Sequence, residues 1–232
     1  MIKAVKIIND LENLFFPTTC LGCTKIIPPH AGSICVSCRH ELPLTQYINE
    51  NDNPTEKILY GRVKIENGAS FLRYYKKGIV QQLIHHLKYK GHEEIGIFFG
   101  KWMGKELAAS KRFNDIDLVI PVPLHPKKLK SRGYNQVSKF GEEIAKALGA
   151  TYSEEILINT SYSKSQTLKD RLSRNFGKKS NYIVTTETNL NEKHILIVDD
   201  VITTGATMER CIKAFSKNKN IKISIATIAI TA

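Results

Sequence analysis

From residue 117 onward, short apolar segments alternate with helical segments, and this pattern constrains the fold more than any other feature of the chain. Alternation of this kind is typical of a parallel sheet with helices packed against it, so the predicted fold class is α/β. The expected strands are Leu118 to Val122, Ile156 to Ile158, Tyr182 to Thr185, Ile195 to Asp199 and Ile221 to Ile230, and the expected helices run from about Tyr134 to Leu148 and from Thr207 to Ser216.

Two carboxylates follow the apolar run Ile195-Leu-Ile-Val198 directly. Ligands of open α/β sheets bind at the carboxyl ends of the strands, where Asp199 and Asp200 would stand. The next residues offer three hydroxyls, a glycine and the first amides of a helix, which together can hold a phosphate. They are Thr203, Thr204, Gly205, Ala206 and Thr207. Two acids facing a phosphate would repel it, so we expect them to accept hydrogen bonds from ribose hydroxyls.

This loop differs from other phosphate-binding motifs. A Walker loop would need a lysine after its last glycine, and a dinucleotide-binding turn would need three glycines. The residues alone therefore predict a site for the phosphate and ribose of one ligand.

Four of the five cysteines lie in the first 40 residues, as two CxxC pairs with eleven residues between them. Four thiolates on two tight turns can complete a tetrahedral Zn²⁺ shell, with each sulfur about 2.3 Å from the metal. Such a shell leaves no position for a catalytic water, so the predicted zinc is structural and its ligands are Cys20, Cys23, Cys35 and Cys38. Disulfides or a redox-active CxxC are the alternatives. A reducing compartment disfavours the first, and a thioredoxin-like motif would occur once, inside a βαβ unit.

The remaining N-terminal half suggests two parts. A short amphipathic helix over residues 2 to 15 and the cysteines would form a module at 1–50, followed by a polar linker. The main domain is expected at 57–232, with a hood at 57–112 and a core at 113–232. Within the hood, residues 60 to 75 predict a β-hairpin turning at Asn67-Gly68, and helices follow from Ile79 to near Gly91 and from Ile95 to Leu107.

The charge balance is strongly basic, with 34 lysines and arginines against 22 acidic residues and a net charge of +12. Such a field attracts phosphates, nucleic acid or an anionic membrane surface, although a lysine-rich composition without any such ligand is the other interpretation. No apolar run reaches the roughly 18 to 20 residues of a membrane-spanning helix, and the N-terminus has no signal-peptide core. We therefore expect a soluble, cytoplasmic protein.

Three segments resemble known families. The run Val198-Asp-Asp-Val-Ile-Thr-Thr-Gly-Ala-Thr207 resembles the phosphoribosyl diphosphate motif of type I phosphoribosyltransferases. The run Val119-Ile-Pro-Val-Pro-Leu-His125, followed by Arg132-Gly-Tyr-Asn-Gln136, resembles the signature of the ComF family, bacterial proteins associated with DNA uptake in natural transformation. That family also carries an N-terminal four-cysteine zinc module. The resemblance implies a type I phosphoribosyltransferase-like sheet, phosphoribosyl diphosphate bound with Mg²⁺, and the DNA-uptake machinery as a source of partners.

The resemblance also implies roles for further residues. The loop after Leu118 to Val122 would contact the diphosphate through Pro123, Leu124 and His125, with Arg132 as a nearby cation. Around Arg132, three lysines within four positions would add positive charge, unless they form only a solvated basic loop. The segment from Ser163 to Lys179 would act as a lid, in which Arg171 and Arg174 bring charge to the leaving diphosphate, or else would be a basic connection without that role.

Two functions from different classes follow from these features. In a transferase, Mg²⁺ and cations neutralise the leaving diphosphate, and Asp199 and Asp200 hold the ribose as oxocarbenium character develops. The acceptor cannot be read from the sequence. The alternative is a non-catalytic module that binds single-stranded DNA, supported by the basic charge and by aromatic residues interleaved with cations between residues 60 and 90. A phosphoribosyl ligand could also regulate DNA binding.

Overall fold

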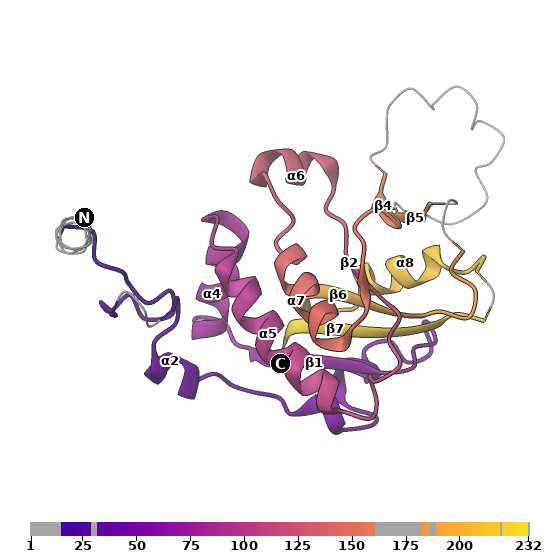
Figure 1. Ribbon diagram of the computed structural model, residues 1–232, viewed down its shortest axis with the longest axis horizontal. Coiled ribbons are helices and arrows are strands. Elements are labelled where there is room, and N and C mark those ends of the chain that lie inside the picture. Colours follow the sequence, from indigo (N-terminus) through magenta and orange to yellow (C-terminus); the bar gives the residue numbers. More distant parts are fainter. Residues whose placement is uncertain (1–14, 29–31, 161–181, 186–188, 219, 232) are drawn as a thin grey trace, which may run out of the picture.

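The computed structural model describes residues 15–28, 32–160, 182–185, 189–218 and 220–231. Its centre is a five-stranded sheet in the order β1-β7-β6-β2-β3, and every adjacent pair is parallel (Figure 1). The strands are β1 (Gly68–Tyr74), β2 (Leu118–Pro121), β3 (Thr151–Tyr152), β6 (His194–Ile202) and β7 (Lys222–Thr231). The predicted α/β class is confirmed.

Helices cover both faces of this sheet (Figure 1). One face carries α4 (Ile79–Tyr89), α5 (Glu94–Ala109) and α7 (Ser138–Leu148), and the other carries α8 (Ala206–Ala214). The shorter helices are α2 (Val36–His40), the 3₁₀ helix η1 (Tyr47–Asn49), α3 (Pro54–Lys57) and α6 (Pro126–Arg132).

The side chains of β6 alternate between the two cores. Leu196 and Val198 pack in the cluster that contains Phe140 of α7, whereas Ile195 and Ile197 pack in the cluster that contains Cys211 of α8. Successive side chains of a strand point to opposite faces, so a strand buried on both faces is apolar throughout. This accounts for the continuous apolar run that precedes the two aspartates.

The cysteine-containing segment packs directly on α4. Cys20 and Cys38 belong to the same buried cluster as Val80 of that helix. A Cβ added at Gly22 would lie 2.9 Å from Ile79 Cδ1 and 3.0 Å from Cys38 Sγ, so the segment approaches α4 closely at this glycine. The core of the N-terminal segment is therefore continuous with the core of the sheet domain.

The predicted hairpin over residues 60 to 75 is wrong. Only β1 forms from this segment, and it pairs in parallel with β7, with Gly68 opposite Ile225. Asn67 directly precedes β1 and does not form a hairpin turn, and its amide donates to Ser224 Oγ over 3.1 Å. The preceding Val63 and Ile65 pack against the cluster on the α8 face. Their alternation therefore reflects partial burial of an irregular segment.

Two other expectations about strands also need correction. The predicted strands near 157 and 183 exist as β4 (Leu157–Asn159) and β5 (Tyr182–Val184), but they form a separate antiparallel pair outside the main sheet. The edge strand β3 was missed, because two residues are too few to show a period. The helix expected over residues 2 to 15 falls almost wholly outside the described residues. Among the described residues, no helix combines the length and apolarity needed to cross a membrane.

Candidate functional site

The two aspartates lie near the carboxyl end of β6. This strand is the middle one of the sheet (Figure 1). They fall inside the strand rather than just after it, and the turn at Thr203 to Gly205 leads into α8. Asp199 and the turn residues line a depression of about 50 Å³, and Thr203 and Thr204 are exposed there. The expected residues at this depression are Asp199, Thr203, Thr204, Gly205, Ala206 and Thr207. The structure thus brings one carboxylate, three hydroxyls and the start of a helix to one place.

The two carboxylates have different surroundings, as the alternation along β6 requires. Asp200 is 5% exposed and accepts a hydrogen bond from Gln136 Nε2 over 2.9 Å. The ammonium of Lys88 lies 3.0 Å from the same carboxylate oxygen, Oδ2. Asp199 lies on the α8 side of the strand. Burial, followed by the charge of Asp200, raises the pKa of Asp199 to about 8, although the Asp200 amide and Lys88 act in the opposite direction.

Arg62, from the segment before β1, forms hydrogen bonds with the turn before α8 and with α8 itself. Arg62 Nη1 donates to the carbonyl of Thr204, and Arg62 Nε donates to Glu209 Oε2 over 2.8 Å. Gly205 adopts a φ of 71°, and a Cβ there would stand 2.5 Å from Ile58 Cγ2. The turn therefore needs glycine both for its backbone conformation and for space.

The loop after β2 reaches the same end of the sheet. Pro123 and Leu124 line a cavity of about 550 Å³ next to β4, and Asn159 Nδ2 donates to the carbonyl of Pro123 over 3.4 Å. His125 caps α6, because its Nδ1 accepts the Lys127 amide over 3.2 Å.

The basic segment predicted as a loop forms the short helix α6 and buries none of its residues. Arg132, its last residue, donates to Gln136 Oε1 and stacks over the Tyr89 ring with 5.0 Å between guanidinium carbon and ring centroid. Arg132 is thus connected to Asp200 through Gln136, although it does not contact the aspartate directly. Arg171 and Arg174, the predicted lid cations, lie outside the described residues.

The four N-terminal cysteines converge on one point. Their sulfur atoms all lie within 4.8 Å of one another, which suits tetrahedral coordination of one ion. The amides of Gly22 and Cys35 donate to Cys20 Sγ over 3.4 and 3.2 Å. Burial opposes ionisation of Cys20, but these and other backbone donors outweigh it and lower the pKa of its thiol to about 6. Burial and side-chain hydrogen bonding with the other three cysteines raise the pKa of the Cys38 thiol, so the fit to structural zinc rests on the convergence of the four sulfur atoms.

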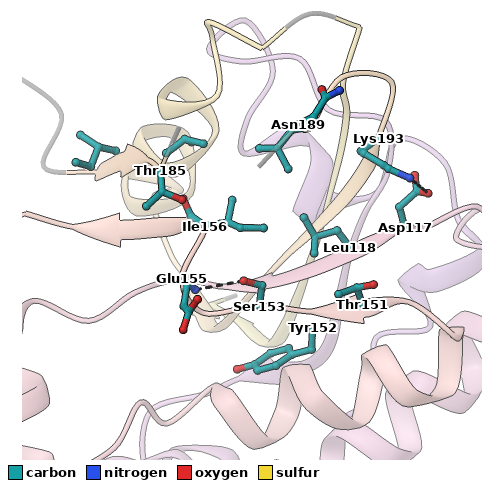
Figure 2. Close-up of a pocket in the computed structure, with 13 residues that line it drawn as sticks. Asp117, Leu118, Thr151, Tyr152, Ser153, Glu155, Ile156, Thr185, Asn189 and Lys193 are labelled. Atoms are coloured by element: carbon teal, nitrogen blue, oxygen red, sulfur yellow. Dashed lines mark hydrogen bonds and ion pairs between the residues drawn. The ribbon is translucent and has the colours of Figure 1, made fainter. Parts of the chain in front are cut away.

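A cavity of about 770 Å³ lies elsewhere (Figure 2). It is lined by the first residue of β2, by β3 and by residues just before β6, including an ion pair of 3.0 Å between Asp117 and Lys193. These are the amino ends of the strands, opposite to the end where ligands of parallel sheets bind. We therefore place the candidate functional site at the aspartates, which carry the reactive groups, and not in this cavity.

An Asp-His-Ser arrangement also occurs at the amino ends of the strands. His194 Nδ1 lies 2.8 Å from Asp115 Oδ1, and His194 Nε2 lies 2.8 Å from Ser224 Oγ. A nucleophilic serine must reach its substrate, yet Ser224 is fully buried and its Oγ accepts the Asn67 amide. This network is structural and connects β6 to β7 and to Asn67, the residue before β1.

Several known proteins are similar to parts of this chain. Residues 138–231 match the model of the phosphoribosyl transferase domain. The DNA utilization protein YhgH of Escherichia coli O157:H7 is 26% identical over 139 residues, which is 59% of this chain and 60% of that protein. The competence protein ComFC of Streptococcus pneumoniae is 29% identical over 123 residues, which is 53% of this chain and 50% of that protein. The matches thus span about half to three fifths of these relatives. A crystal structure of adenine phosphoribosyltransferase aligns with 66% of this chain and 75% of its own at 13% identity, with a TM-score of 0.37.

The parallel sheet, the turn after β6 and the matched segment define a phosphoribosyltransferase domain in the C-terminal part of the chain. Over its matched part, the chain is similar to the DNA utilization protein YhgH and the competence protein ComFC.

Three residues that contact the site were not assigned to it from the sequence. Lys88 and Gln136 hold Asp200, and Arg62 holds the turn. Gln136 is the last residue of the segment Arg132 to Gln136, which resembles the ComF signature. Lys88 follows the buried Ile84 by four residues, so a cation within an apolar helical stripe was the available signal.

Proposed function

We propose that this protein binds phosphoribosyl diphosphate together with Mg²⁺ at the carboxyl end of β6. The observation that carries the proposal is the arrangement of Asp199 beside the exposed hydroxyls of Thr203 and Thr204 at the start of α8. The first amides of a helix have no intrahelical acceptor, and together with the helix dipole they favour a phosphate. A partly buried carboxylate next to them suits hydroxyl donors of a ribose.

The chain's own groups would divide the work on this ligand. The turn from Thr203 to Thr207 would hold the phosphate attached to the ribose, and Asp199 and Asp200 would hold the sugar. The exposed lysines of α6 and the half-buried Arg132 would attract the diphosphate, whose remaining charge Mg²⁺ neutralises. In a transfer reaction this arrangement would stabilise the oxocarbenium character and the departing diphosphate by electrostatics. The match with the named relatives supports a role in DNA use or uptake.

Calorimetric titration with phosphoribosyl diphosphate and Mg²⁺ tests this proposal. We expect one binding site per chain, and loss of binding when Asp199→Ala is combined with Asp200→Ala. Asp117→Ala is a suitable control, because Asp117 lies at the opposite ends of the strands and pairs with Lys193. Unchanged binding in the double variant would refute the assignment.

A second candidate function is binding of single-stranded DNA. The observation that favours it is the surface formed by α6 and the end of α4, where Tyr89 is 65% exposed and Arg132 stacks on its ring. Basic grooves with exposed aromatic rings suit single strands, because bases stack on such rings. Of the other aromatic residues between residues 60 and 90, Tyr60 and Tyr75 are exposed, but Phe71 is buried and belongs to the core.

Retention of a fluorescent single-stranded oligonucleotide, measured over a range of salt concentrations, tests the second candidate. A steep loss of affinity with salt is expected, because each phosphate contact releases counterions. The Tyr89→Ala variant should bind more weakly at every salt concentration. If the protein retains no oligonucleotide at low salt, this function is excluded.

A further inference from the structure

Asp200 is held by two donors from outside its own strand. Lys88 Nζ lies 3.0 Å and Gln136 Nε2 lies 2.9 Å from the same oxygen, Oδ2. The aspartate side chain is 7% exposed and the lysine side chain 25% exposed, so most of this ion pair is removed from water. Two donors on one oxygen fix the direction of the carboxylate group. The other oxygen, Oδ1, is then held in a defined direction as well.

Lys88 reaches the aspartate because of its place on α4. It follows Ile84 by four residues, so it extends the face of the helix that packs against the sheet. The end of this helix is itself fastened, because the Tyr134 hydroxyl donates to the carbonyl of Leu87. The loop that carries Tyr134 also carries Gln136, so both donors to Asp200 belong to one connected structure.

The positive charge of Lys88 matters because of what the site contains. Asp199 and Asp200 are consecutive, and burial together with the charge of Asp200 raises the pKa of Asp199, whereas Lys88 lowers it. An unpaired carboxylate at Asp200 would repel both its neighbour and an anionic ligand. Four ionisable groups interact with Asp199 through their charges. They are Asp200 of β6, Lys88 of α4, Cys211 of α8 and Tyr182 of β5. Among these four groups, Lys88 is the cation.

We propose that Lys88 is a positioning residue of the phosphoribosyl site, which together with Gln136 orients Asp200 toward the ribose and cancels its charge. This inference rests on the proposed binding of phosphoribosyl diphosphate. It assigns to a helix outside the matched segment, residues 138–231, a direct part in forming the site. The site is then incomplete without α4.

Binding of phosphoribosyl diphosphate with Mg²⁺ to the full chain, measured by calorimetry between pH 6.5 and 9, tests the role of Lys88. In Lys88→Met we expect the Kd to rise at least about tenfold, which corresponds to about 1.4 kcal/mol. Lys88→Arg should keep most of the affinity, because it retains the charge and the donor. Lys90→Met is the matched control, because it removes the same charge from the end of the same helix. Lys90 is exposed, and its ammonium contacts His86 instead of Asp200.

The pH dependence separates positioning from a general effect on structure. Affinity should rise with pH as Asp199 ionises, and in Lys88→Met this rise should move to higher pH because the lysine no longer favours the ionised form. Loss of the fold would not move the pH of the transition. If Lys88→Met does not fold, Lys88→Gln, which keeps a donor without the charge, takes its place.

The outcomes distinguish this inference from the function on which it rests. If the unaltered protein binds the ligand and Lys88→Met binds it equally well with the same pH dependence, the role of Lys88 is refuted and the proposed function stands. If Lys90→Met weakens binding as much as Lys88→Met, the effect comes from net charge and the positioning role is also refuted. If the unaltered protein does not bind, both proposals fail.

Discussion

Replacement of Asp199 by asparagine should make the free protein more stable, and increasingly so as the pH rises. Asparagine keeps an oxygen that can accept the Asp200 amide, which donates to Asp199 Oδ1 over 2.8 Å. It removes the charge that the site disfavours, since burial and the neighbouring Asp200 raise the pKa of Asp199 from 3.8 to about 8. The variant therefore isolates the cost of placing a second carboxylate in a ligand-free site.

The magnitude follows from this pKa. The change is roughly 4 pKa units, and one unit corresponds to about 1.36 kcal/mol, so the full cost in the free protein is at most about 5 to 6 kcal/mol. The sign follows from proton binding. Above the pKa of the unfolded chain, the folded protein still holds the proton of Asp199 while the unfolded chain has lost it. The stability due to Asp199 is therefore present below about pH 4 and falls by up to about 1.4 kcal/mol per pH unit until about pH 8.

Urea denaturation of both proteins, without ligand, measures this effect between pH 5 and 7. The free energy of unfolding of Asp199→Asn minus that of the unaltered protein should grow by up to about 2.7 kcal/mol over these two pH units. Asp117→Asn provides a control of opposite sign. A hydrogen bond from the His194 amide, followed by one from Lys193, lowers the pKa of Asp117. Removing this carboxylate should therefore destabilise the protein, and the loss should be the same at pH 5 and at pH 7. A pH-independent difference for Asp199→Asn would refute the reasoning.

Three further variants test other parts of the structure. Cys20→Ser should abolish binding of one zinc ion per chain. It should also lower the midpoint of thermal unfolding, because the cysteine module packs against α4. Elemental analysis of the unaltered protein that finds no zinc would contradict the assignment. Gly205→Ala should cost roughly 1 to 3 kcal/mol of stability, because of its positive φ and the close Ile58, and should weaken binding of phosphoribosyl diphosphate. Ser224→Ala should cost about 1 to 3 kcal/mol in urea denaturation, because it leaves Nε2 of the buried His194 without its partner, while affinity for the ligand stays unchanged. A loss of affinity with full stability would instead point to a chemical role.

The sequence was sufficient for the parts of the fold that repeat a strong pattern. The run Ile195 to Val198 is buried on both faces of β6, and a continuous apolar segment of that length indicates a central parallel strand. The four cysteines could be grouped because their spacing is a local property. The aspartates and the turn after them could be placed because the carboxyl end of such a strand is where ligands bind.

Other parts depended on contacts between distant segments and could not be predicted. The alternation before Gly68 suggested a hairpin, but strand pairing depends on which partner is available, and β7 offered a parallel partner to β1. Lys88 is separated by more than a hundred residues from Asp200, so no local pattern connects them. Arg62 likewise meets the turn only because the chain folds back over it.

The alternation of β6 explains why two adjacent aspartates do not act as a like-charged pair. Asp200 points to the face that carries α4 and α7, where Lys88 and Gln136 hold it, whereas Asp199 points to the face of α8 and lies beside the turn. If the pair were separated by one more residue, both side chains would point to the same face and would compete for the same cation. The Asp-Asp dipeptide therefore places one carboxylate in a paired, oriented state and leaves the other to respond to the ligand. This division requires a cation on only one face of the strand, and in the described structure α4 provides it.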